Sequence, residues 1–264
     1  MEARALGFVV SPRLMGFFQR QALRFLEASV PDPVLRAKLT PSYAIGCKRI
    51  LIPNDYYPAL QRPNVGLVTD GIVRITRTGI RTRDGVERPV DAISCGTGFM
   101  VADYVNTLNI VGRGGRTLNA SVQDREGHHL GTTVRGFPNL FLMMGPNTGL
   151  GHNSMVFMIE AQTRYALQAI QAIRRRKLRF LDVREPVQRA LTERVQRKLN
   201  GSVWNSGCRS WYVGEDGYNL TLWPFFTFQY WWQTRRLALA DYEMVPVAAA
   251  PEPVAMPVPA PSIA

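Results

Sequence analysis

The sequence has few cysteines and no long apolar segment, and both absences narrow what the protein can be. Cys47, Cys95 and Cys208 stand far apart in a chain of 264 residues. Their spacing favours neither a disulfide framework nor a Cys-x-x-Cys metal site, so we expect a reducing, cytoplasmic setting and no bound metal. No apolar segment approaches the ~18 residues that a membrane span requires. The N-terminal segment, broken at Ser11-Pro12, is a poor match to a signal peptide.

The motifs of self-contained catalysis are also missing. The sequence has no Gly-x-Ser-x-Gly nucleophile motif and no convincing Cys-His-Asn set, and its carboxylates are scattered. His128 and His129 lie in a polar stretch without a further ligand for zinc. No Gly-x-Gly-x-x-Gly loop follows a predicted strand. If the protein is an enzyme, we therefore expect a cofactor to supply its chemistry.

Negative charge is scarce, since the formal net charge is +12. Such a balance favours anionic partners. The only dense basic cluster, residues 173–177, ends a predicted helix, where cations oppose the helix dipole. Without a nucleic-acid motif or aromatic residues interleaved with the cations, we expect no nucleic-acid partner. The hypothesis of a basic protein that binds nucleic acid or membranes ranks last, because it explains the net charge but none of the motifs.

Helical spacing predicts a helix over residues 13–39, interrupted by Pro31 and Pro33, with Asp32 as the cap of its second part. A short strand is expected at residues 50–52. The pattern from residue 65 to residue 92 predicts strands, with a hairpin turn at Asp84-Gly85. Residues 90–95 are apolar enough for a buried strand. Together these segments predict alternating strands and helices.

Residues 139–144 predict another buried strand, and a glycine-containing loop follows it. Asn153 or Ser154 then caps a helix. A second helix should run from about residue 183 to residue 199, with Asp182 as its cap and Asn200-Gly201 as its end. The Pro/Ala-rich residues 245–264 predict a disordered tail. The apolar face of the first helix is expected to comprise Met155, Met158, Ile159, Leu167, Ile170 and Ile173.

Three segments could hold a ligand, and each has a plainer interpretation. Lys48 and Arg49 on a strand would point to opposite faces and could meet two different anionic groups, or be two solvated charges. The glycines at residues 96–98 allow close backbone approach, or form an ordinary turn. The loop at residues 145–154 offers donors from Asn147, Thr148 and Asn153 beside a helix start, or is only a capped polar loop.

Taken together and in order, these motifs resemble the C-terminal portion of Baeyer–Villiger-type flavin monooxygenases, in the group that oxidises cyclohexanone and 4-hydroxyacetophenone. The resemblance rests on residues 40–72, the Gly-Thr-Gly-Phe turn, residues 131–162 and residues 206–236, and reaches about residue 240. It implies FAD and NADPH as cofactors. It also implies that one oxygen atom of O2 is inserted into a small-molecule ketone, through a flavin C4a-peroxide, to give an ester or lactone.

The resemblance also implies roles for individual residues. Arg49 matches the arginine that stabilises the negatively charged peroxide, a role suited to a guanidinium. Lys48 matches a contact to the 2′-phosphate of NADPH, Trp211 matches a tryptophan on a mobile loop that reaches NADPH, and Met155 falls at a substrate-pocket position. The remaining cofactor-binding positions are the interdomain turn at Gly96, Thr97 and Gly98, and the flavin-side loop and helix start at Gly145, Pro146, Asn147 and Asn153.

The resemblance predicts an α/β fold: a partial two-dinucleotide-binding-domain flavoprotein fold of the FAD/NAD(P)-binding type, lacking the N-terminal Rossmann βαβ unit. Residues 1–98 would end the NADPH domain with a β-hairpin return, 99–244 would be the C-terminal part of the FAD domain, and 245–264 the tail. The chain would be a truncated half, inactive alone and dependent on a complementing N-terminal polypeptide. There are two alternatives. One is a related flavin monooxygenase that oxidises nitrogen or sulfur, and the other is a catalytically inactive remnant.

Overall fold

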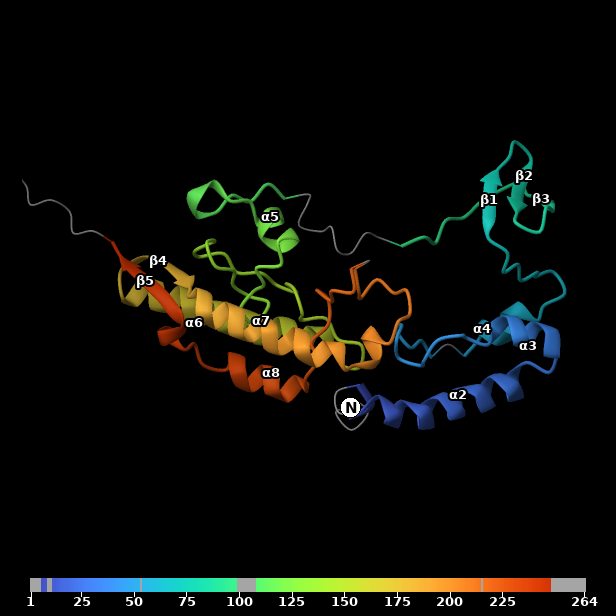
Figure 1. Cartoon of the computed structure of the whole chain (residues 1–264), viewed down its shortest axis with the longest axis horizontal. Helices are drawn as coiled ribbons and strands as arrows, with labels where there is room; N and C mark the ends of the chain where they lie inside the picture. Colours follow the sequence, from blue (N-terminus) through green and yellow to red (C-terminus); the bar gives the residue numbers. More distant parts are fainter. Residues whose placement is uncertain (1–5, 9–10, 53, 99–107, 215, 248–264) are drawn as a thin grey trace, which may run out of the picture.

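The computed structural model describes residues 6–8, 11–52, 54–98, 108–214 and 216–247 and is mixed α/β (Figure 1). Its α-helices and strands, in chain order, are α2 (Met15–Ser29), α3 (Pro33–Leu39), α4 (Tyr56–Leu60), β1 (Ile72–Ile75), β2 (Gly79–Thr82), β3 (Glu87–Pro89), α5 (Leu118–Gln123), α6 (Met155–Arg175), β4 (Leu178–Val183), α7 (Glu185–Asn200), α8 (Thr227–Thr234) and β5 (Tyr242–Pro246). Short 3-10 helices are η1 (Pro12–Leu14), η3 (Arg113–Gly115), η4 (Val203–Asn205) and η5 (Leu239–Asp241).

The main core lies around α6, which packs between α7, α8 and the antiparallel pair β4–β5 (Figure 1). Large aromatic side chains fill it, and their polar atoms are mostly paired: the Tyr165 hydroxyl lies 2.9 Å from that of Tyr242, and the Tyr230 hydroxyl donates to Leu130 O at 2.6 Å. Buried aromatic residues contribute much apolar area while each keeps a polar group that needs a partner. The fully buried ones are Trp204, Trp223, Tyr165, Tyr212, Tyr230 and Tyr242.

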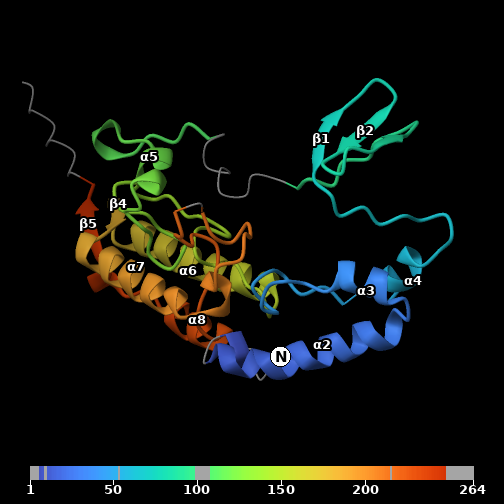
Figure 2. The ribbon, with the colours of Figure 1, turned by 45° about the vertical axis from the view of Figure 1, so that its right-hand side comes forward.

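The N-terminal helices follow the sequence prediction. Val34 N donates to the Asp32 carboxylate at 2.9 Å, so Asp32 caps α3 as expected, with Pro33 in the first turn. Phe25 of α2 packs on Tyr57 of α4 with ring centroids 5.9 Å apart. Figure 2 shows α2, α3 and α4 extending away from the body formed by α6, α7 and α8.

The sheet β1–β2–β3 is antiparallel, and its second turn lies at Asp84-Gly85, as predicted (Figure 2). Gly85 has φ +82°, the left-handed region that favours glycine. Asp84 also accepts from Val86 N at 3.1 Å and forms an ion pair with Arg88 at 2.7 Å. The hydrogen bonds and ion pairs of this sheet therefore stabilise its shape from within.

Several predicted strands do not form. Residues 50–52, 65–69 and 90–95 are irregular, and the large apolar side chains among them are mostly exposed. Residues 139–144 are partly buried but irregular, and Leu142 N donates to Thr132 O at 2.8 Å rather than to a strand. An apolar segment becomes a strand only beside another strand. Among the described residues no strand lies beside 50–52, 65–69 or 90–95, and 139–144 meets β4 only at Asn139, whose N–H donates to Leu181 O at 3.2 Å.

The C-terminal half confirms some details and corrects others. Helix α6 follows Ser154 as its N-cap residue, and α7 ends at Asn200 before Gly201, as predicted. Asp182 is not the cap of α7: it lies in β4, where it accepts from Gly136 N at 3.0 Å, and Arg184 takes the cap position. Residues 245–246 belong to β5 rather than to the predicted tail, and 248–264 lie outside the described residues.

The predicted apolar face of α6 is partly wrong. Leu167 and Ile170 are 52% and 50% exposed, whereas Met158 is buried. The fully covered stripe instead carries Ala161, Gln162, Tyr165, Ala166 and Ala169. Small alanines let neighbouring backbone come close, and a rule that looks for large apolar residues overlooks them.

Candidate functional site

Two of the predicted segments meet in space. The guanidinium Nη1 of Arg49 lies 3.5 Å from the carbonyl oxygen of Leu150, which is in the loop at residues 145–154. Residues 101 positions apart in the sequence are thus neighbours. The contact is a long hydrogen bond, and Arg49 forms no ion pair with any carboxylate in the described ranges. Its charge and most of its donors stay available to an anionic group.

A disulfide holds the Arg49 segment in place. Cys47 is fully buried and is bonded to Cys208, with the two Cα atoms 6.3 Å apart and 161 positions apart in sequence. The expectation that no cysteines pair is therefore wrong for these two, while Cys95 is free and exposed. Spacing alone could not reveal the pair, because the fold brings the two sulfur atoms together. The bond connects the segment of Lys48 and Arg49 to the loop of Trp211.

Lys48 lies beside a cavity of about 410 Å³, together with Arg209. Its Nζ stands 4.6 Å from the centre of the Tyr43 ring, a cation–π contact that orients the ammonium group. The other lining residues are small or polar: Ser42, Ala44, Ser206, Gly207 and Cys208. Two cations on the wall of one cavity suit an anion such as a phosphate.

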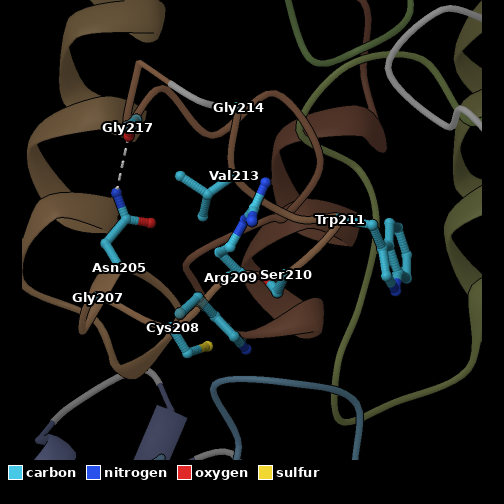
Figure 3. A pocket seen from close by; sticks show the side chains of 10 residues that line it. Asn205, Gly207, Cys208, Arg209, Ser210, Trp211, Val213, Gly214 and Gly217 are labelled. Atoms are coloured by element: carbon cyan, nitrogen blue, oxygen red, sulfur yellow. Dashed lines mark hydrogen bonds between the residues drawn. The ribbon is translucent and has the colours of Figure 1, made fainter. Parts of the chain in front are cut away.

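A larger cavity of about 770 Å³ shares the wall formed by Gly207, Cys208 and Arg209 (Figure 3). Trp211 lies at its edge, with its ring 51% exposed and turned away from Val213 in Figure 3. The same ring contacts Tyr212 at a centroid distance of 4.4 Å. A large exposed aromatic ring next to Arg209 offers a stacking surface near positive charge.

The loop at residues 145–154 is held by buried hydrogen bonds around Asn147. The Asn147 amide donates to Asn219 O at 2.7 Å and to Leu222 O at 3.1 Å, and its oxygen lies 3.0 Å from His128 Nε2. Asn147 has φ +52°, so this network maintains an unusual backbone conformation. With its side chain fully used, Asn147 positions the loop rather than presenting its own donors.

His128 is the residue that the sequence prediction overlooked. It is 1% exposed, it faces Asn147, and its Nδ1 accepts from Gly131 N at 2.8 Å. Burial lowers the pKa of His128 to about 4, so the ring is neutral at pH 7. The polar stretch around it gave no signal of burial.

The start of α6 adds a second source of positive charge. Ser154 is the N-cap residue but makes no side-chain capping bond, while Asn153 accepts from Ser154 N at 2.9 Å and donates to Thr227 at 2.8 Å. Met155 is partly buried, and its sulfur accepts from Leu150 N at 3.1 Å. The N-terminal end of this helix of 21 residues favours negative charge nearby.

Buried polar atoms without partners gather around this loop. Both ring nitrogens of His152, the indole nitrogen of Trp204 and the hydroxyl of Tyr212 are buried and make no hydrogen bond. The His152 ring stacks with Trp204 at 6.2 Å, and burial lowers its pKa to about 4. Burial raises the pKa of Tyr212, an effect that the nearby Arg49 opposes. Buried polar groups are normally paired, so these four atoms are exceptions to that rule.

Close backbone approaches shape the same loop. A side chain at Gly145 would collide with Gly131 O, and a Cβ at Gly149 would lie 2.6 Å from Thr221 O. By contrast, Gly96, Thr97 and Gly98 lie on an exposed segment, and no hydrogen bond in the described part of the chain joins them to Arg49 or to the loop. The structure therefore brings together the Lys48–Arg49 segment, the loop at 145–154 and the Trp211 loop, and leaves the turn at 96–98 apart.

These features suit anionic groups at two places. Arg49 and the α6 N-terminus supply positive charge at the loop, and Lys48 and Arg209 stand by a cavity. Within the ranges that the structure describes, there is no cluster of three metal-binding side chains, and no helix is both long and apolar enough to cross a bilayer.

Comparison with protein-family models gives no match. Comparison with curated proteins does: the chain is 47% identical over 253 residues to a Baeyer–Villiger monooxygenase of Pseudomonas aeruginosa, covering 94% of this chain and 48% of that protein. Among solved structures, an oxidised steroid monooxygenase bound to NADP is 28% identical with a TM-score of 0.80, covering 92% of this chain and 47% of the other. A complex of OTEMO with FAD and NADP has the same fold, at 23% identity and a TM-score of 0.82, covering 91% and 46%.

The mixed α/β fold thus aligns with part of the flavoprotein monooxygenase structures. The chain is a homologue of the Baeyer–Villiger monooxygenases, and it spans about half the length of the curated relatives it matches.

Proposed function

We propose that this chain forms the C-terminal half of an FAD- and NADPH-dependent monooxygenase that converts ketones to esters or lactones, completed by a polypeptide that carries the other half. The observation that carries the proposal is the contact between Arg49 and Leu150, at 3.5 Å, because Leu150 N also donates to the sulfur of Met155, the first residue of α6, at 3.1 Å. Leu150 thus joins the two sources of positive charge. The identity to a Baeyer–Villiger monooxygenase supports the choice of reaction.

Arg49 would stabilise negative charge that develops beside the flavin. A guanidinium stays charged at any relevant pH and offers several donors in a fixed plane. Such preorganised donors are worth most in a site that excludes water, where they need no reorganisation during the reaction. When bound, FAD would supply the oxygen activation and NADPH its electrons. The disulfide beside Arg49 restricts the backbone and so keeps the guanidinium near the loop.

Lys48 and Arg209 would hold a phosphate of NADPH, and Trp211 would cover part of the same cofactor. The two cations lie on the wall of one cavity, and the exposed Trp211 ring lies on the adjoining cavity. The loop between them is connected to the Lys48 segment through Cys208. Met155 would lie where the ketone enters, although its sulfur already accepts a hydrogen bond from Leu150 N.

The test replaces Arg49 with alanine in the enzyme made from this chain and its complementing half. We expect ester formation to fall by at least about 100-fold, while the reduction of bound flavin by NADPH continues. Absorbance near ~450 nm follows the flavin, and product analysis follows the ester. Arg20→Ala, a change of an exposed arginine on α2, is the matched control. An Arg49→Ala enzyme with normal ester yield would refute the role given to Arg49.

A further inference from the structure

Apolar residues are exposed along the segment that runs from just after Arg49 to just past the end of β3. In residues 50–52 and 54–93, only Gly79 and Thr82 are buried. Leu51 and Ile52 are 75% and 83% exposed, and neighbouring valines and isoleucines are also uncovered. Large contiguous apolar areas on a protein surface mark interaction sites. We call this area the 50–93 surface; its most exposed apolar members are Leu51, Ile52, Ile72, Val73 and Ile75.

Strand β1 shows the exposure most clearly. Ile72, Val73 and Ile75 are 64%, 58% and 64% exposed. Successive side chains of a strand point to opposite faces, and all four residues of β1 are exposed, so both faces of the sheet are uncovered at β1. In the described ranges β1 pairs only with β2, which leaves the other edge of β1 free. An uncovered apolar edge strand is a template for pairing with another chain.

The sheet keeps its shape without a core, so the surface is ready to bind. Thr76 donates to Glu87 at 2.7 Å and Arg88 pairs with Asp84 at 2.7 Å, and the strands bond to one another. Figures 1 and 2 both show the sheet standing apart from the body that contains α6 and α7. The steroid monooxygenase structure aligns with 92% of this chain at a TM-score of 0.80, and the chain covers 47% of that protein. The chain as a whole thus resembles part of a protein about twice as long.

We propose that the 50–93 surface binds the polypeptide corresponding to the unmatched half of the Baeyer–Villiger relatives. That half supplies strands beside the irregular segments 50–52 and 90–93 and beside the free edge of β1. It also supplies apolar side chains that cover Ile72, Val73 and Ile75 of β1. The inference rests on the proposed function for its choice of partner, and binding is measurable without any activity.

The experiment co-expresses the full 264-residue chain with the unmatched half of the Pseudomonas aeruginosa relative and measures the mass of the purified product by light scattering. The two halves of the relative itself, co-expressed in the same way, show that the partner half is competent. We expect a one-to-one complex for this chain as well. A chain that stays free while the control pair associates would overturn the inference.

Two pairs of substitutions locate the contact. Val73→Lys with Ile75→Lys places two positive charges on β1 and should weaken the complex at least about tenfold. Phe228→Lys with Trp232→Lys, on α8, changes residues that are 56% and 63% exposed and should leave binding unchanged. Circular dichroism of each free variant verifies that it folds like the parent chain. Equal weakening by both pairs would overturn the assignment to the 50–93 surface.

The remaining outcomes separate this inference from the proposed function. A complex that forms through β1 but gives no ester supports the surface and counts against the function. If the chain forms homodimers through β1, and these homodimers persist when the partner half is present, then the proposed partner of the 50–93 surface is wrong. In that case flavin retention by the chain still tests the function on its own.

Discussion

The disulfide between Cys47 and Cys208 should contribute a large part of the stability of this chain. The perturbation is Cys47→Ser or Cys208→Ser. The bond closes a loop with a sequence separation of 161 residues. Loop-closure entropy for that length gives about 5 kcal/mol at 25 °C, and measured disulfides usually contribute about 2–4 kcal/mol. We therefore expect each serine variant to lose about 2–5 kcal/mol of unfolding free energy.

Urea unfolding followed by tryptophan fluorescence measures the loss. With a slope of roughly 2.5 kcal/mol per M, the midpoint should fall by about 1–2 M. Cys95→Ser is the matched control, because Cys95 is exposed and unpaired, and its midpoint should not move. The double variant Cys47→Ser/Cys208→Ser should lose no more than either single variant, since each already removes the same bond.

Alkylation under denaturing conditions shows directly whether the bond exists. Without a reductant, iodoacetamide should modify one of the three cysteines, Cys95, and after reduction it should modify all three. Three modified cysteines without reduction would refute the disulfide. Midpoints of both serine variants that equal those of the parent and of Cys95→Ser would refute its contribution to stability.

Two further predictions concern the buried histidines His128 and His129 and the close backbone approach at Gly149. Acid should destabilise the chain, because burial lowers the pKa of His128 and His129 to about 4 from the ordinary 6.5. The contribution of the two neutral rings to the unfolding free energy is complete above pH 6.5. It is lost as the pH falls to 4, by up to roughly 3 kcal/mol for each histidine. Equal urea midpoints at about pH 7.5 and about pH 4.5 would contradict this. Gly149→Ala should lower the unfolding free energy by about 2 kcal/mol or more, since the new Cβ would lie 2.6 Å from Thr221 O. Gly96→Ala is the control: its Cβ would meet open space, so the same urea experiment should give an unchanged midpoint.

Elements that depend on local chemistry could be predicted from the sequence. The Asp32 cap, the Asp84-Gly85 turn and the end of α7 at Gly201 each need only a few adjacent residues. The start of α6 at Ser154 belongs to the same group. Such positions follow from side chains that bond to nearby backbone or from glycine's freedom at positive φ.

Features that depend on distant neighbours could not be predicted in this way. The strands expected at residues 50–52 and 90–95 lack a neighbouring strand in the described structure, so their apolar pattern produces no sheet. The Cys47–Cys208 bond and the contact of His128 with Asn147 join segments that only the fold brings together. The pairing of Arg49 with the 145–154 loop also needed the fold, although each segment had been singled out separately.

The described chain therefore has two parts that should respond differently to a partner. The candidate site is stabilised by its own contacts: the disulfide, the buried network of Asn147 and the aromatic core around Trp204. The 50–93 surface has internal hydrogen bonds but almost no buried apolar residue. Because burial of apolar area is the main source of stability, binding of the other half should protect the 50–93 surface from proteolysis far more than it protects the site. Equal protection of both parts would mean that the site, too, depends on the partner for its geometry.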